Sequence, residues 1–250
     1  MIFRIAGREL RSLFVSPLAW VVLAVLTLIL AFLFVVYVDL FVAGQSQMLG
    51  MDSGRGLTEG VAAPLFNNAA FILLLVVPLI TMRLIADERR NRTLSLLFSA
   101  PVSMTEIVLG KYLGVLAFFG VVILIVAAMP LSLLAGGGLD MGLFASALLG
   151  LALIVAAFAA VGLFMSSLTQ SATIAAISSF GALLLLWVLD WSGEASTQGK
   201  ALLGYLSLLN HYEPFMRGVF DSADAAYYLL FIVLFLGLTV RRLDADRVGA

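Results

Sequence analysis

Long apolar stretches separated by short polar segments fill most of the chain. Each of six stretches holds about 20 apolar residues, enough for a helix to cross a hydrocarbon core about 30 Å thick. They are too long and too uniformly apolar for barrel strands, and a helix satisfies its backbone polar groups internally. The sequence therefore predicts an all-α, polytopic membrane protein with a single transmembrane domain over residues 1–250. The six predicted spans cover residues 18–38, 64–84, 107–134, 142–163, 172–189 and 223–240.

The first fifteen residues predict a separate amphipathic helix. At about 100° per residue, Arg4, Arg8 and Arg11 share one narrow arc, and apolar side chains fall on the opposite side. A basic amphipathic helix of this kind lies in the membrane interface, and Pro17 is well placed to start the first span. The alternative is that the three arginines serve only as a topology signal.

The distribution of basic residues predicts the orientation of the spans. With the N-terminus inside, eleven of the fourteen Lys and Arg residues fall on the inner side, and Arg55, Lys200 and Arg217 fall outside. Cytoplasmic loops carry the excess of Lys and Arg, so both termini should be cytoplasmic.

Composition agrees with a membrane protein. The chain is 63% hydrophobic and 12% charged, whereas a soluble domain has about 45–50% apolar and about 25% charged residues. Membrane lipid is thus an expected partner, while the formal net charge of −1 gives no reason to expect a nucleic acid. The chain has no cysteine, so disulfide and thiol chemistry are not expected.

Segment 83–112 interrupts the apolar pattern on the predicted cytoplasmic side. It holds five of the fourteen basic residues, and an arginine at bilayer depth costs roughly 2.5–3.5 kcal/mol on insertion scales, so its basic cluster has to lie in water. We predict an amphipathic helix over residues 87–100, ended by Pro101. Ser103 and Glu106 then form a capping box that starts the third span.

A short amphipathic helix held between two spans is suited to receive force from a soluble partner. Pro78 predicts a kink in the span just before it. The alternative is an ordinary solvated loop. We call the surface that would receive this force from the soluble partner the coupling contact. Its predicted residues are Asp87, Glu88, Arg89, Arg90, Arg92, Thr93, Leu94 and Leu97.

The outer segment 192–222 regains helical apolar spacing and predicts one or two short helices that cover the outer face. Its candidate outer-gate residues are His211, Glu213, Phe215 and Arg217. A rival interpretation makes this segment the working part of a membrane-embedded enzyme or an assembly scaffold. That rival requires a polar cluster around His211, Glu213 and Arg217.

The sequence has few residues and motifs that are typical of catalytic sites. His211 is the only histidine, and neither a GxSxG motif nor a Walker A motif occurs. We therefore predict no catalytic residue and no metal site in the chain. No charged residue falls near the middle of a predicted span, whereas ion-coupled carriers bury such residues along their pathways. The energy for any transport should therefore come from elsewhere.

The charged insert resembles the permease subunits of ABC transporters of the ABC-2 class. Arg92 and Ser95 stand where that class usually has glycine and glutamate. The matching residues are Asp87-Glu88-Arg89, Asn91 to Leu97, Ser99 to Ser103, and Glu106 to Lys111. The outer stretch from Tyr205 to Asp221 is similar to the gliding-motility and nitrous-oxide-reductase-maturation branch of the class.

The resemblance implies a non-catalytic half of a type V-like exporter in a bacterial cytoplasmic (inner) membrane. Cytoplasmic ABC ATPase subunits would bind ATP and Mg and dock on the coupling helix, so the chain itself needs no cofactor. A second permease copy or a homologue would complete the transporter, and an auxiliary subunit with a periplasmic domain is a further implied partner. Residues 1–15 match the elbow helix of the class. The lack of charge in the spans favours an amphipathic, lipid-linked or polymeric cargo, and a purely mechanical role stays open.

Overall fold

The computed structural model describes residues 1–47, 56–91, 102–135, 138–188 and 206–248. The regular elements in these ranges are all helical, so the predicted all-α fold is confirmed. A π-helical turn, Thr58–Ala62, leads into the second long helix, and a 3₁₀ turn, Ser132–Ala135, follows the third. The helices are α1 (Ile2–Val15), α2 (Pro17–Gln47), α3 (Ala63–Thr81), α4 (Arg83–Arg90), α6 (Met104–Leu131), α7 (Met141–Leu168), α8 (Ala172–Val188), α10 (Leu208–Met216) and α11 (Ser222–Val248).

Five helical segments among the described residues are long and apolar enough to cross a membrane. Helix α8 is also apolar but shorter, with 17 residues. The five segments are Pro17–Gly44, Thr58–Arg90, Met104–Leu134, Met141–Leu168 and Ser222–Arg247. Each predicted apolar stretch coincides with one of these segments or with α8, and the chain is a polytopic membrane protein.

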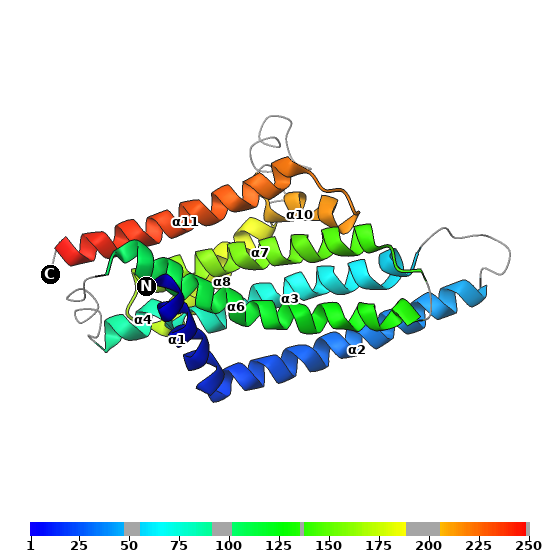
Figure 1. Cartoon of the computed structure of the whole chain (residues 1–250), viewed down its shortest axis with the longest axis horizontal. Helices are drawn as coiled ribbons and strands as arrows, with labels where there is room; N and C mark the ends of the chain where they lie inside the picture. Colours follow the sequence, from blue (N-terminus) through cyan, green and yellow to red (C-terminus); the bar gives the residue numbers. More distant parts are fainter. Residues whose placement is uncertain (48–55, 92–101, 136–137, 189–205, 249–250) are drawn as a thin grey trace.

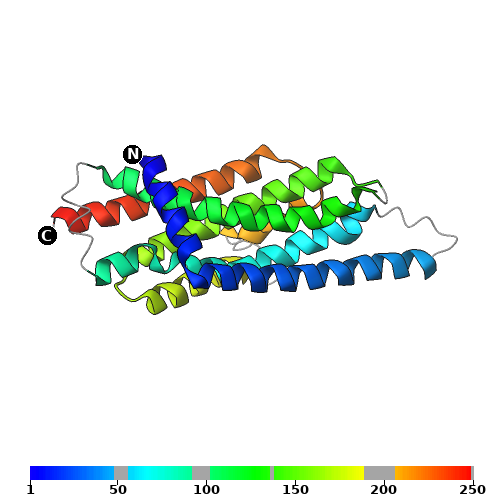
Figure 2. The ribbon, with the colours of Figure 1, turned by 60° about the horizontal axis from the view of Figure 1, so that its bottom comes forward.

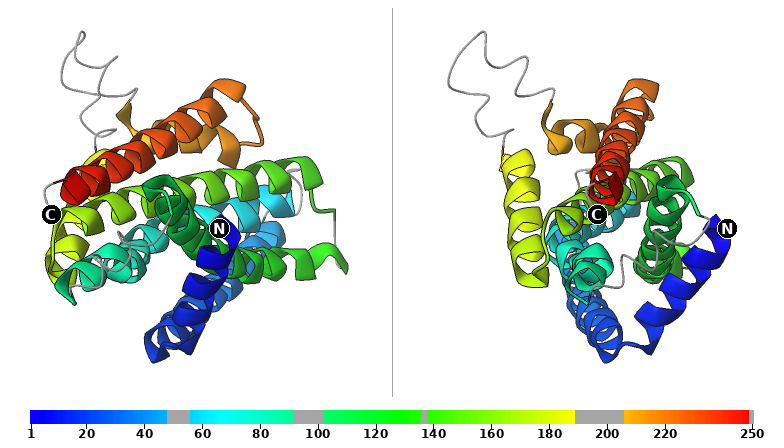
Figure 3. Two further views of the ribbon diagram at one scale, coloured as in Figure 1. Left: turned by 60° about the vertical axis from the view of Figure 1, so that its left-hand side comes forward. Right: turned by 90° about the vertical axis from the view of Figure 1, so that its left-hand side faces the viewer.

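The long helices lie side by side along the longest axis of the molecule (Figure 1). Both chain termini lie at one end of this bundle, which we call the terminal end; we call the opposite end the far end. Helix α1 crosses the outside of the bundle at the terminal end (Figure 2). Helix α10 packs against α7, α3 and α11 towards the far end. Views from the terminal end place α8 and α1 on opposite sides of the bundle (Figure 3).

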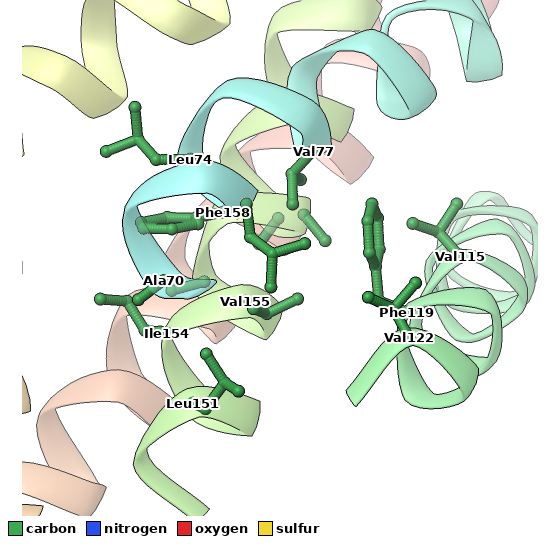
Figure 4. Close-up of a cluster of buried hydrophobic side chains, with 14 of the residues drawn as sticks. Ala70, Leu74, Val77, Val115, Phe119, Val122, Leu151, Ile154, Val155 and Phe158 are labelled. Carbon is green, nitrogen blue, oxygen red and sulfur yellow. The ribbon is translucent and has the colours of Figure 1, made fainter. Parts of the chain in front are cut away.

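The core lies where α3, α6 and α7 meet. Helix α7 is its centre, because it also packs against α8, α10 and α11. Branched and aromatic side chains from the three helices fill the space between them (Figure 4). These include Ala70, Leu74 and Val77 of α3, Phe119 and Val122 of α6, and Leu151, Ile154 and Phe158 of α7.

Small residues of α7 bring its neighbours into close contact. A Cβ atom on Gly162 would collide with the Thr81 side chain of α3, and one on Gly150 would lie 2.6 Å from Cβ of Phe215 in α10. Glycines that admit such close approach are typical of helix packing in membranes, where small residues permit tight van der Waals contact.

The outer faces of α2 and α11 are apolar and exposed. Leu28 and Phe32 of α2 are 70% and 66% exposed, and Leu230 and Val233 of α11 are 69% and 66% exposed. Contiguous apolar surface of this extent is not expected on a soluble monomer. These faces are suited to contact with lipid or with another membrane helix.

Local side-chain contacts explain where two of the long helices begin. The Ser103 hydroxyl accepts from the backbone N–H of Glu106, and the Glu106 carboxylate accepts from the backbone N–H of Ser103, which confirms the predicted capping box. At the start of α7, Oδ1 of Asp140 accepts from the N–H groups of Gly142 and Leu143 at 2.9 and 3.2 Å. Both caps satisfy N–H groups that have no partner within the helix.

Candidate coupling site

Helix α4 extends the second span beyond the core at the terminal end. It contains the first four predicted coupling residues, Asp87 to Arg90, in its last turn. Of these, Arg90 is exposed and the others are half-buried. The remaining predicted coupling residues, Arg92, Thr93, Leu94 and Leu97, lie outside the described residues, as does the rest of the predicted helix up to residue 100.

A serine from α7 caps the beginning of α4. The hydroxyl oxygen of Ser166 accepts from the N–H groups of Ile85 and Ala86, both at 3.1 Å, and donates to the carbonyl of Met82 at 2.8 Å. Met82 is the single residue between α3 and α4. A side chain inserted into the backbone ladder is a recognised cause of helix bending. Ser166 is itself fully buried. Its three hydrogen bonds fix the α3–α4 junction to the central helix α7.

The residues that precede this junction also depart from a regular helix. Pro78 has no N–H to donate, and the Thr81 hydroxyl donates to the carbonyl of Val77 at 3.0 Å. Helices α3 and α4 meet at Met82, one turn after Pro78, and Ser166 bonds to the same point of the chain.

A buried lysine joins α4 to α6 and α1. Lys111 of α6 is 1% exposed, and its ammonium group lies 2.7 Å from the Glu88 carboxylate and 3.4 Å from the Glu9 carboxylate. It also donates to the carbonyl of Leu84 at 2.8 Å. Three acceptors therefore surround one ammonium group, which satisfies the requirement that a buried charge be both paired and hydrogen-bonded.

The contact between α1 and α6 is close because two glycines face α1. A Cβ atom on Gly110 would lie 2.6 Å from Cβ of Ile5, and one on Gly114 would lie 2.7 Å from Cβ of Glu9. This small-xxx-small spacing allows the two backbones to approach. It also brings the Glu9 carboxylate within reach of Lys111.

Helix α1 turns its basic residues away from this contact. Arg4, Arg8 and Arg11 are exposed, while apolar residues such as Leu10 and Phe14 pack against the core. At its end, the carbonyl of Phe14 accepts from the Trp20 indole N–H at 2.8 Å, which fixes the turn into α2. The helix is therefore amphipathic, as the sequence predicts.

The end of α11 makes a fourth connection to α4. The guanidinium group of Arg89 is paired with the carboxylate of Asp246, which also lies 3.5 Å from Arg242. Both members of the Arg89–Asp246 pair are half-buried. Helix α4 thus makes direct polar contacts with α6, α7 and α11, and Lys111 of α6 connects it to Glu9 of α1. We call this set of contacts the α4 junction.

The predicted outer-gate residues all lie on or next to α10, near the far end, but they point in different directions. Nδ1 of His211 lies 2.6 Å from the Asp224 carboxylate of α11, and the imidazole stacks on Tyr227. Glu213 and Arg217 pair with each other at 2.8 Å on the exposed face. In the part of the chain that the structure describes, His211 thus pairs with Asp224, whereas Glu213 and Arg217 pair with each other.

The fourth outer-gate candidate faces the core. Phe215 is fully buried against Gly150 of α7. Beside it, the Tyr212 hydroxyl donates to the carbonyl of Phe66 in α3 at 3.0 Å, and burial raises the pKa of Tyr212 above its usual range, so the phenol keeps its proton. Helix α10 is therefore anchored to α3, α7 and α11.

Sequence reasoning did not single out several residues of the α4 junction. Ser166, Glu9 and Asp246 carry no local signal, because their partners are about 80 or more residues away in the chain. Lys111 did have a local sequence signal, because it lies inside a predicted span between Gly110 and Gly114. A charged residue within a membrane span is a functional candidate.

The fold and the α4 junction define the class of the protein: it is an all-α membrane protein with a set of polar contacts between its helices at the terminal end. The sequence model of a family described as ABC-2 family transporter protein matches residues 3–246, nearly the whole chain. The chain therefore belongs to that family, and it is the membrane component of a transporter. A comparison with curated proteins found no match.

Proposed function

We propose that the chain is the non-catalytic permease subunit of an ATP-driven ABC exporter and that α4 receives the motion of a separate ATPase. The observation that carries the proposal is the α4 junction, in which α4 makes polar contacts with α6, α7 and α11 and shares Lys111 with Glu9 of α1. In this proposal ATP and Mg bind to the ATPase, and its closure pushes on residues 87–100. The push reaches the core through Ser166 and the elbow helix α1 through Lys111.

The proposed topology has six crossings with both termini in the cytoplasm. Both termini lie at the terminal end, and a chain that begins and ends on one side of a membrane crosses it an even number of times. Five segments are long enough to span, so α8 is the sixth crossing. The excess of basic residues at the terminal end supports a cytoplasmic location for that end.

A second permease, either another copy or a homologue, completes the transport path in this proposal. Exposed apolar side chains on α2 and α8 support a membrane-embedded partner. On α8, Ile174 and Ile177 are 59% and 67% exposed. The outer stretch that ends at Asp221 leads us to place the chain in the gliding-motility and nitrous-oxide-reductase-maturation branch.

The topology can be tested with single cysteines, because the natural chain has none. We expect Arg217→Cys to react with a membrane-impermeant maleimide in intact cells. Arg90→Cys should react only after the membrane is permeabilised. Labelling of Arg90→Cys in intact cells would overturn the proposed orientation.

The coupling role can be tested by co-purification. We expect the wild-type chain to retain a nucleotide-hydrolysing subunit, and Arg90→Glu to reduce the amount retained because it reverses an exposed charge on α4. Arg217→Glu makes the same charge change at the far end and should retain the wild-type amount. Equal retention by both variants would show that α4 does not receive the ATPase.

A further inference from the structure

A cavity of about 440 Å³ opens between α1, α2, α3, α4 and α6 at the terminal end. Its volume falls within the range of about 300–1,000 Å³ that is typical of ligand sites. One wall carries charged side chains from α1 and α4, and the other carries apolar side chains from α2 and α3. A site with this division is suited to an amphiphile.

The charged wall has two arginines free to bind an anion. Lys111, Glu9 and Glu88 line the cavity but satisfy one another in the α4 junction. Arg8 and Arg83 also line it, and neither has an ion-pair partner among the described residues. Guanidinium groups suit phosphate because their planar N–H donors match its oxygens.

The carboxylate of Asp87 favours a ligand that also carries a positive charge. Asp87 lines the same cavity, is half-buried, and has no ion-pair partner within the described ranges. Lys111 together with Glu9 and Glu88 carries a net charge of −1, so with Arg8, Arg83 and Asp87 the charges that line the cavity sum to zero. A phosphate linked to an amine complements this arrangement.

The apolar wall lies at the depth expected for lipid. It includes Leu18 of α2 and Leu79 of α3, and Leu79 is 44% exposed, so this wall opens to the outside of the bundle. Trp20 lies one half-turn beyond Leu18 and is 59% exposed, and such tryptophans mark the level of the headgroups. Charged and apolar walls therefore meet at the membrane interface.

We propose that this cavity binds an aminophospholipid, with the phosphate held by Arg8 and Arg83 and the amine near Asp87. The acyl chains leave past Leu18 and Leu79 into the bilayer. The lipid stands between the elbow helix and α4, so it would join the two elements that the coupling motion involves. The assignment to the cytoplasmic leaflet rests on the proposed topology, whereas the site itself does not.

Native mass spectrometry of the delipidated full-length chain tests the site directly. With dioleoylphosphatidylethanolamine added, we expect the wild type to retain one lipid per chain. The double variant Arg8→Gln, Arg83→Gln should bind it at least about tenfold more weakly, because it removes the charge-assisted contacts to the phosphate.

The matched control is Arg4→Gln, Arg90→Gln, which removes the same charges from the same two helices at positions that do not line the cavity. Its affinity should stay within about twofold of the wild type. A loss equal to that of the first double variant would show that only general surface charge attracts the lipid, and the site would be wrong.

Two further arms separate the site from alternative ligands. Asp87→Asn should weaken binding of phosphatidylethanolamine but leave phosphatidylglycerol unchanged. Glycerophosphoethanolamine, which has the headgroup but no acyl chains, should not displace the lipid at equal concentration; displacement would identify a site for a soluble phosphate instead.

A neutral variant keeps the test valid if the arginine variants unfold. Ser12→Phe adds an aromatic ring at an exposed position that lines the cavity, and it should also reduce lipid binding. Normal lipid binding by this variant would contradict the proposal. Because none of these measurements involves an ATPase, failure here is distinguishable from failure of the proposed function.

Discussion

Ser166 shows how one hydroxyl group can determine the geometry of a helix junction. It satisfies three backbone groups at the break between α3 and α4, and it belongs to a different helix. Replacing it removes three hydrogen bonds from a fully buried environment, where a backbone group left without a partner costs about 1–3 kcal/mol.

We therefore expect Ser166→Ala to lower the free energy of unfolding by about 1–3 kcal/mol, measured as a shift in thermal or denaturant unfolding in detergent. Ser167→Ala is the matched control. Its hydroxyl is equally buried but donates only to the carbonyl of Phe164 in its own helix, so it should cost less than about 1 kcal/mol. Equal effects would show that the α3–α4 cap is not a source of stability.

Lys111 is the second residue with a large expected effect. Removing one member of a buried ion pair costs about 3–5 kcal/mol, chiefly because the other charge is left unpaired. Glu9 and Glu88 retain 14% and 21% exposure of their side chains, so the lower end of that range applies. We expect Lys111→Met to destabilise the protein by about 3 kcal/mol in an unfolding titration.

The triple variant Lys111→Met, Glu9→Gln, Glu88→Gln is the control for this prediction. It removes the charges together, so no carboxylate is left without its cation, and much of the stability should return. A triple variant as unstable as Lys111→Met would mean that the lysine acts through packing of its alkyl chain.

At the scale of elements, the position of α1 depends on its contact with α6. Gly110 and Gly114 admit α1 at a distance that no larger residue allows. The contact sets both the place of Glu9 beside Lys111 and one wall of the terminal-end cavity.

We expect Gly114→Ala to displace α1 and to increase the rate of tryptic cleavage at Arg4, Arg8 or Arg11. Overpacking of a close contact costs about 1–3 kcal/mol, which shifts the local equilibrium towards the detached helix. Gly120→Ala is the control on the same helix, since a Cβ atom there meets nothing within 4 Å. Unchanged cleavage of Gly114→Ala would mean that α1 is held by its other contacts.

Apolar length located the apolar helices but not their ends. Helix α2 continues to Gln47 and α11 to Val248, beyond predicted ends at residues 38 and 240. Hydropathy reports membrane depth, whereas a helix can continue into water. The start of α6 was predictable to the residue, because the capping box of Ser103 and Glu106 is a local signal.

At the scale of the whole molecule, the sequence predicts an all-α membrane protein but not the α4 junction. The spans follow from local composition. The junction depends on pairs far apart in the chain, such as Ser166 with Ile85 and Arg89 with Asp246, and neither pair has a local pattern. The four predicted outer-gate residues lie on or next to α10, but their side chains separate because Phe215 and His211 fall on faces that pack against different neighbours.

The lipid-facing surface offers a prediction for the molecule as a whole. Leu230 lies near the middle of the α11 span and is 69% exposed. We expect Leu230→Arg to raise the cost of insertion by roughly 2.5–3.5 kcal/mol and to reduce the yield of folded protein in the membrane fraction.

Val219→Arg serves as the reference for that measurement. Val219 is 56% exposed and lies outside the helices, so its variant should accumulate close to the wild-type level. Normal accumulation of Leu230→Arg would show that this face of α11 borders water.

The distance in sequence between Glu9 and Lys111 constrains how the chain is assembled during translation. The two residues are separated by 102 positions, so the anchor for α1 does not exist until the first turns of α6 have been synthesised. Until then Glu9 has no lysine to meet, and the N-terminal helix can rest only on the bilayer surface. The ribosome thus adds about 100 residues after Glu9 before α1 can dock in its final position.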